Sequence, residues 1–163
     1  MNTGPSPGKP ASASRLEAVH IVMPSDANVH GNAFGGMVMQ WTDLAGAMAA
    51  MRHARLPVVT ASVDQLSFLA PMRVGHIAVL RARVNAVFGT SMEVEVEVVA
   101  EDPETGVRVK GCDAFLTFVA LGPDGRPTRI EPLLLENDDD HRREAEARER
   151  RSARLAKRSR HPG

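Results

Sequence analysis

A single acidic residue inside an apolar stretch is the first feature of the sequence that could do chemistry. Asp43 lies among Met, Val, Trp, Leu and Ala side chains in residues 37–52. A helix that is apolar nearly all round is buried, and a lone carboxylate in it is costly unless it is paired or used. Because an ionised carboxylate that faces a cavity can act as a general base or as a nucleophile, Asp43 is a candidate catalytic residue.

The loop before this helix supplies further candidate groups. Residues 24–36 are rich in Pro, Ser, Asn, Asp and Gly, which favour shaped loops. The amide of Asn28 can orient a water molecule or donate a hydrogen bond to an oxygen atom. Gly35 and Gly36 stand where the helix begins, and the leading N–H groups of a helix are unpaired and carry the positive end of its dipole. Without side chains, these glycines let a carbonyl oxygen approach that backbone closely.

Each of these residues also has a structural interpretation. Asp43 can be an acid that bonds a neighbouring loop, and Asn28 can simply cap a turn. We expect Asp26 to hold the loop through backbone N–H groups, and we expect His30 to be incidental to catalysis. The scattered histidines and the single cysteine lack the spacing of a zinc site, so the sequence implies no metal and no redox cofactor.

The elements that must position these residues follow from hydrophobic periodicity. The clearest strand is 92–98, in which Met and Val alternate with Glu93, Glu95 and Glu97. Similar patterns predict further strands at 16–23, 58–69, 74–88 and 107–121. A helix is predicted over about 36–52, and a hairpin turn is predicted at 101–106. This order predicts an α+β fold in which a long antiparallel sheet surrounds one buried helix.

Two expectations about packing follow from this arrangement. In the segment 74–88, the alternation places Phe88 on the same apolar face as Leu80 and Val84. The central helix should be buried against the inner face of the sheet through Met37, Val38, Trp41, Leu44, Ala45 and Met48. A second helix is expected over about 137–157, with too few apolar positions to enter the core.

The length and composition of the chain limit its possible domain organisation and its possible binding partners. A chain of 163 residues with 43% hydrophobic content suits one globular domain. We expect a disordered tail at 1–14, the domain at 15–135 and a charged, helical tail at 136–163. Twenty basic and twenty acidic residues cancel, and the few aromatic residues offer no stacking platform, so neither nucleic acid nor a membrane is an expected partner. Without a signal peptide or an internal disulfide, a cytoplasmic location is expected.

The ordered motifs resemble the hotdog-fold acyl-CoA thioesterases, that is, the cytosolic acyl-CoA hydrolases and their bacterial single-domain relatives. The resemblance covers about residues 16–121, and it rests on Asp26-x-Asn28, Phe34-Gly35-Gly36, Asp43, Val59-Thr60-Ala61-Ser62-Val63-Asp64 and Thr90-Ser91-Met92-Glu93-Val94. It implies a hotdog fold and hydrolysis of the thioester of fatty acyl-CoA to a free fatty acid and CoA. Coenzyme A would then be part of the substrate, and no other cofactor is needed.

The resemblance also implies roles for individual residues. The residues that match the catalytic pair of the family are Asn28 and Asp43, which two chains contribute across a dimer interface. The substrate-binding residues implied by the matching motifs are Phe34, Gly35, Gly36, Thr60, Ser62 and Ser91. A homodimer is then the minimum unit, and a homohexamer built as a trimer of dimers is expected, with the glutamates of strand 92–98 offering polar contacts between dimers.

Other functions remain open from the sequence. A hotdog hydratase would need a catalytic histidine near the start of the helix, whereas His30 lies outside the helix. A non-catalytic acyl-CoA-binding module would keep the glycine loop and need neither Asn28 nor Asp43. Arg73, Arg81 and Arg83 are candidates for the CoA phosphates, although each is better interpreted as a solvated cation.

Overall fold

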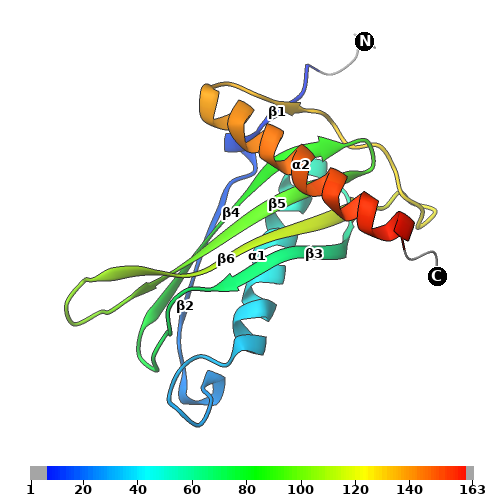
Figure 1. Cartoon of the computed structure of the whole chain (residues 1–163). Coiled ribbons are helices and arrows are strands. Elements are labelled where there is room, and N and C mark those ends of the chain that lie inside the picture. The colour runs from blue at the N-terminus through cyan, green and yellow to red at the C-terminus, as the bar shows by residue number, and fades with distance from the viewer. Residues whose placement is uncertain (1–6, 161–163) are drawn as a thin grey trace.

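The computed structural model describes residues 7–160, and its main element is a five-stranded antiparallel sheet (Figure 1). The strands lie in the order β2-β4-β5-β6-β3, so β2 and β3 form the two edges. Their bounds are β2 Leu16–Ile21, β3 Val58–Phe68, β4 Ile77–Phe88, β5 Ser91–Glu101 and β6 Arg108–Ala120. Each predicted extended segment forms one strand, and the predicted hairpin joins β5 to β6. The expected α+β architecture is therefore confirmed.

The central helix α1, Gly35–Ala54, packs across the inner face of this sheet (Figure 1). Val38, Trp41, Ala45 and Ala49 recur at helical spacing and are buried against the strands. Gly46 lies on the same face, where a Cβ atom would come within 3.0 Å of the Phe118 ring. The absence of a side chain at this position is what lets the helix approach β6 closely.

The opposite face of α1 departs from the expected burial. Val38, Trp41 and Ala45 are buried as predicted, whereas Leu44 is 51% and Met48 is 39% exposed, and Met37 is only partly buried. One sheet can cover only one side of a helix. A helix that is apolar on both sides therefore leaves an uncovered apolar face in the single chain, where the sequence predicted none.

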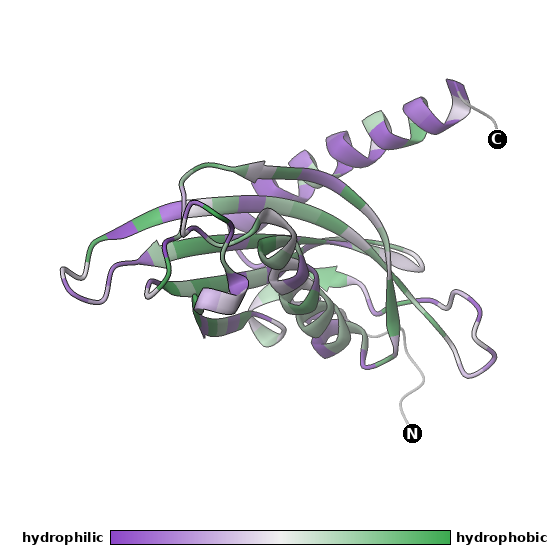
Figure 2. Ribbon diagram, turned by 90° about the horizontal axis from the view of Figure 1, so that it is seen from below, coloured by the Kyte–Doolittle hydropathy of each residue, from purple (hydrophilic) through white to green (hydrophobic). Residues whose placement is uncertain are grey.

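The second helix α2, Asp138–Arg160, lies on the outer face of the sheet, opposite to α1. Figure 2 shows it as hydrophilic along most of its length, in contrast to the strands, in which hydrophobic residues predominate. Ala147 is its one buried apolar residue among those described. The predicted charged helix is thus present, and it covers part of the sheet through polar side chains.

A bulge in β4 turns Phe88 to the face of the sheet opposite to the one predicted. The pairing with β5 slips between Val84 and Ala86, so that Val87 lies opposite Met92 and contacts the core. Phe88 consequently turns to the outer face, where the guanidinium of Arg151 lies 4.8 Å from the centre of its ring.

The N-terminal segment is more ordered than predicted from residue 9 onward. Lys9–Pro10 forms the short strand β1, which pairs in parallel with β7, Leu133–Leu134. Lys9 Nζ donates a 2.7 Å hydrogen bond to the carbonyl oxygen of His53 at the end of α1, and Ala11 is buried. The expectation of disorder is therefore wrong for residues 9–14, because these contacts hold the segment, while residues 1–6 and 161–163 lie outside the described part. No helix within residues 7–160 is long and apolar enough to cross a membrane.

Candidate active site

The acidic residue in the central helix has a partner on the edge strand. Thr60 Oγ1 donates a 2.6 Å hydrogen bond to Asp43 Oδ1, and the side chain of Asp43 is half-buried at the border between the covered and the uncovered face of α1. Asp43 Oδ2 has no hydrogen-bond partner within residues 7–160. The carboxylate is therefore held by one oxygen and has the other available to a water molecule.

The start of α1 presents free backbone donors. The N–H group of Phe34 donates to the Asp26 carbonyl oxygen at 2.7 Å, whereas the N–H groups of Gly35 and Gly36 find no acceptor in the described part of the chain. Cβ atoms at these glycines would meet the rings of Phe68 and Phe34, at 3.3 and 2.8 Å respectively. The two glycines thus permit close packing of both rings and leave two donors at the positive end of the helix.

The loop carrying Asn28 is held by its own side chains. Asn28 Oδ1 accepts hydrogen bonds from the N–H groups of His30 and Asn32, at 2.9 and 3.3 Å. Asp26 Oδ2 accepts from the N–H group of Met23 at 2.9 Å, as expected for a loop-holding acid. Asn28 Nδ2 makes no hydrogen bond to the described residues and remains a free donor.

A pocket lies between this loop and the end of β3. Its volume is about 340 Å³, and its lining includes Asn28, Gly35, Val38, Phe68 and Met72. It combines an apolar wall with an amide and the start of a helix, which suits a ligand that has both a carbonyl group and an apolar part. Asp43 lies outside this lining, so this pocket holds Asn28 without Asp43.

Two of the predicted substrate-binding residues lie on the outer face of the sheet. Ser62 Oγ donates a 2.9 Å hydrogen bond to Asp64 Oδ1 in a cluster covered by α2. Ser91 precedes Met92, which is buried in the core, so the side chain of Ser91 faces the outer side. Phe34, Gly35, Gly36 and Thr60 are on the α1 side. Ser62 and Ser91 therefore lie on the face of the sheet opposite to these four residues.

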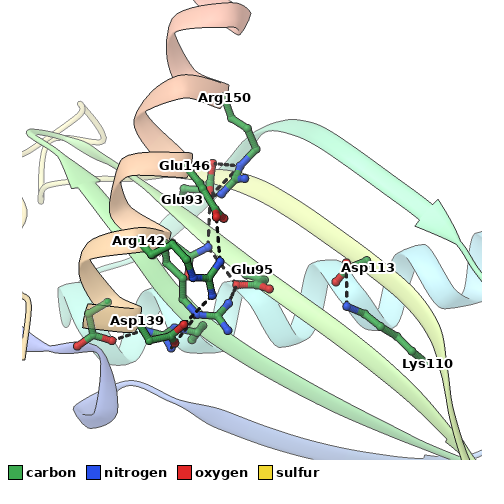
Figure 3. A network of polar contacts seen from close by, with 12 residues as sticks. Glu93, Glu95, Lys110, Asp113, Asp139, Arg142, Glu146 and Arg150 are labelled. Carbon is green, nitrogen blue, oxygen red and sulfur yellow. Dashed lines mark hydrogen bonds and ion pairs between the residues drawn. The ribbon is translucent and has the colours of Figure 1, made fainter. Parts of the chain in front are cut away.

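The sequence did not reveal a network of ion pairs that fixes α2 to the outer face (Figure 3). Arg150 Nη2 lies 2.8 Å from Glu93 Oε1, and Arg143 pairs with Glu95. Glu93 is only 1% exposed. Both glutamates are engaged within the chain, and Glu93 is too deeply buried under α2 to offer the expected contact to another dimer. For Glu95 and Glu97 the expected contact stays a prediction. The alternation of Glu with Val in strand β5 was the sequence pattern that indicated a polar face, but this pattern does not indicate which element covers that face.

The three candidate phosphate-binding arginines differ in whether they form ion pairs. Arg81 pairs with Glu17 at 3.0 Å, and Arg83 pairs with Asp140 at 2.6 Å. Arg73 has no ion pair with the described residues and follows Met72 of the pocket lining, with its backbone bridged to Asn32. Arg73 is therefore the arginine best placed to meet a ligand at the pocket.

Two further observations bear on the chemistry available. Burial raises the pKa of the Cys112 thiol to about 11, so this thiol stays protonated and is a poor nucleophile at neutral pH. Within residues 7–160, no three His, Cys, Asp or Glu side chains gather in a way that could hold a metal ion. The Asp43 carboxylate, the Asn28 amide and the N–H groups that open α1 remain the candidate groups for acting on a carbonyl.

Sequence comparisons identify similar proteins. The model of the thioesterase superfamily matches residues 30–107. The chain is similar to the cytosolic acyl coenzyme A thioester hydrolase of Rattus norvegicus, at 35% identity over 92% of this chain and 40% of the relative. An uncharacterized acyl-CoA thioester hydrolase of Bacillus subtilis, YkhA, is 36% identical over 78% of this chain and 74% of the relative. The chain spans only 24% to 40% of the length of the first mammalian relatives.

Solved structures show the same fold. An acyl-CoA hydrolase from Staphylococcus aureus, determined with butyryl coenzyme A and coenzyme A, is 35% identical and superposes with a TM-score of 0.86 over 92% of both chains. An apo-hexameric acyl-CoA thioesterase is 34% identical, with a TM-score of 0.88 over 91% of this chain and 96% of that one. These similarities, together with the observed strand order, confirm the hotdog fold.

Proposed function

The chain belongs to the thioesterase superfamily, and on that premise we propose that it hydrolyses acyl-CoA thioesters to a free fatty acid and coenzyme A. The observation that carries this proposal is the Asp43 carboxylate, which Thr60 holds by one oxygen at 2.6 Å. At the start of α1, about two turns before Asp43, the N–H groups of Gly35 and Gly36 have no acceptor within residues 7–160. A carbonyl polariser and a proton acceptor are the two groups that hydrolysis of a thioester needs.

The proposed reaction uses these groups in sequence. The thioester oxygen accepts hydrogen bonds from the opening N–H groups of α1 in one chain, and the Asn28 amide of that chain provides a further donor. Asp43 Oδ2 of a second chain takes a proton from a water molecule, whose oxygen attacks the carbonyl carbon. The C–S bond then breaks, the sulfur leaves as thiolate and takes up the proton, and the carboxylic acid is released. Direct attack by Asp43, followed by hydrolysis of the resulting anhydride, is the alternative route.

The complete site is proposed to form between two chains. The pocket that Asn28 lines does not include Asp43 of the same chain, and Asp43 lies beside β3, which is an edge of the sheet. An edge strand offers unpaired backbone groups to another strand. A second copy joined at β3 would cover the exposed side chains of Val63 and Leu44 and would bring its own Asn28 loop toward Asp43.

The exposed apolar residues support this dimer. Leu44, Met48 and Met51 form a stripe on the face of α1 that points away from its own sheet. Exposed apolar patches of this kind mark interfaces. Assembly of three dimers into a hexamer is supported by the hexameric thioesterase that the chain resembles, and a cytoplasmic location by the cytosolic hydrolase of rat.

Release of free thiol from a panel of acyl-CoAs of increasing chain length tests the proposed function. We expect the purified protein to release one thiol for each thioester consumed, and the Asp43→Asn protein to be slower by about 100-fold or more. Binding of acyl-CoA without thiol release at any chain length would contradict the enzyme and favour a non-catalytic binding module. Formation of a hydrated acyl-CoA from an enoyl-CoA would instead favour a hydratase.

A further inference from the structure

A buried carboxylate on the outer face of the edge strand ties that strand to α2. Asp64 Oδ1 accepts a 2.9 Å hydrogen bond from Ser62 Oγ, and Asp64 Oδ2 accepts from Thr117 Oγ1 and from Arg154 Nη1, both at 2.8 Å. Arg154 Nη1 also donates to Thr117 Oγ1 at 2.8 Å. The side chain of Asp64 is 7% exposed, so the guanidinium supplies the one positive charge in contact with a buried negative one.

This cluster lies where β3 is least constrained by the sheet. The pairing of β3 with β6 slips twice, between Thr60 and Ser62 and again between Val63 and Gln65, which leaves Ala61 and Asp64 as bulged residues. As an edge strand, β3 pairs with β6 and with no other strand among residues 7–160. Between the bulges, Ser62 and Val63 keep their pairing with Thr117 and Leu116. The Ser62–Asp64 hydrogen bond spans this short segment, so side chains add to the backbone pairing in fixing its shape.

The same segment carries the partner of Asp43. Thr60 stands directly before the first bulge and faces α1, while Ser62 and Asp64 face α2. A change in the shape of the bulged segment therefore moves the Thr60 hydroxyl relative to Asp43 Oδ1. Reacting groups that are displaced by about 1 Å lose up to about 100-fold in rate.

Arg154 is the last of the cationic anchors along α2. The preceding anchors, Arg143 and Arg150, bind Glu95 and Glu93 of the central strand β5. Within residues 7–160, the side-chain hydrogen bond and ion pair between α2 and β3 come from Arg154, near the end of the helix. Because α2 has only one fully buried apolar residue, Ala147, this guanidinium is the main polar link between the helix and the edge strand.

We propose that Arg154 is a positioning residue for the active site: it neutralises Asp64 and thereby fixes the bulged segment of β3 that presents Thr60 to Asp43. Only the expected effect of Arg154 on the rate of hydrolysis rests on the proposed function. The link from Arg154 to the Asp43 carboxylate is a structural statement, and it can be measured in the absence of any substrate.

The test replaces Arg154 by methionine, which keeps the apolar stem and removes the charge, in the full chain. Arg158→Met is the matched control, because Arg158 is an exposed arginine one turn further along the same helix. We expect Arg154→Met to lower kcat by about 10- to 100-fold with KM nearly unchanged, and Arg158→Met to leave both unchanged. Equal kinetics of the two variants would overturn the proposal.

A double-mutant cycle with Thr60→Ala separates positioning from general destabilisation. If Arg154 acts through Thr60, Arg154→Met causes little further loss of kcat in the Thr60→Ala protein. Losses that multiply would show that the two residues act independently and would refute the proposal. Should Arg154→Met fold poorly, the Arg154→Met/Asp64→Asn protein, which leaves no unpaired buried charge, replaces it in the cycle.

A spectroscopic measurement decides the proposal even if the protein hydrolyses no thioester. With ¹³C-labelled aspartate carboxylates, the Asp43 signal of Arg154→Met should move toward its position in Thr60→Ala, and the signal of Arg158→Met should stay in place. An Asp43 signal unmoved by Arg154→Met would refute the link. A parent protein without thiol release would refute the proposed function alone.

Discussion

Thr60 and Asp43 are joined by a 2.6 Å hydrogen bond that links the edge strand β3 to the middle of the central helix. The threonine hydroxyl donates to one carboxylate oxygen and thereby fixes the direction of the second oxygen. Seventeen positions separate the two residues in the chain. The contact therefore exists only because α1 and β3 run side by side in the fold, and it makes the geometry of β3 a property of the active site.

The first prediction concerns the proposed base. Asp43→Asn keeps the size of the side chain but removes its ability to accept a proton, so kcat for thiol release should fall by about 100-fold or more. Glu149→Gln, on an exposed position of α2, serves as the control for loss of one carboxylate and should retain full activity. A folded Asp43→Asn protein with near-normal turnover would remove Asp43 from the mechanism.

The second prediction separates two roles of Asn28. Its Oδ1 holds the loop through the N–H groups of His30 and Asn32, while its Nδ2 is free to donate to a substrate. Asn28→Asp keeps the oxygen acceptors and removes the donor. If catalysis needs the donor, this variant should lose about 100-fold in kcat at an unchanged melting temperature.

Asn28→Ala is the comparison for that experiment, because it removes both the acceptor and the donor. It should be slow and also less stable than Asn28→Asp, as expected from the loss of two loop hydrogen bonds. Full activity of Asn28→Asp, together with a lower melting temperature of Asn28→Ala, would mean that Asn28 only caps the turn.

A third prediction concerns the sharing of sites between chains. When inactive Asn28→Ala and Asp43→Asn chains are mixed in equal amounts and allowed to exchange, random pairing gives about one quarter of sites with both residues intact. Thiol release should therefore recover to about one quarter of the parent value. If mass spectrometry demonstrates exchange and no activity returns, each site must be built from one chain.

A fourth prediction concerns the uncovered face of α1. Leu44→Glu places a charge in the apolar stripe and should shift the protein from an oligomer to a smaller species in light scattering, because an interface core excludes unpaired charge. Leu155→Glu changes a leucine of similar exposure on α2 and should leave the mass unchanged. A Leu44→Glu protein with the parent mass would place the interface elsewhere.

The last prediction concerns the pH dependence of stability. His53 is fully buried at the end of α1, where its Nε2 lies 2.9 Å from the Glu131 carbonyl oxygen. Burial lowers the pKa of His53 below the usual 6.5, and the hydrogen bond to Glu131 opposes this effect without cancelling it. Below pH 6.5 the unfolded chain therefore binds more protons than the folded one, and the free energy of unfolding should decrease as the pH falls.

This dependence is measured by chemical denaturation between pH 7.5 and 5. His53→Gln retains an amide donor toward the Glu131 carbonyl but cannot titrate, so its stability should change less over the same interval. His141→Gln, at an exposed position on α2, should behave like the parent. An identical pH dependence of the parent and His53→Gln would assign the effect to other groups.

The sequence alone determined the class of fold and the identity of the candidate acid. Alternation of apolar and charged residues marks a strand wherever one face is buried, so the strands were predicted to within a few residues of β3, β5 and β6. Asp43 could be identified in the same way, because burying an unpaired carboxylate in an apolar helix is energetically unfavourable unless the group is paired or has a function. Both patterns involve residues close together in the chain, so they can be recognised from the sequence alone.

Tertiary structure decided which residues meet. A slip of one residue in β4 turned Phe88 from the core to the outer face, since side chains alternate with a period of two. Burial of Glu93 under Arg150 depends on where α2 lies, which no pattern within either segment specifies. The exposure of Leu44 depends on how much of α1 a single sheet can cover. These outcomes arise from contacts between residues distant in the chain, and only the folded molecule brings such residues together.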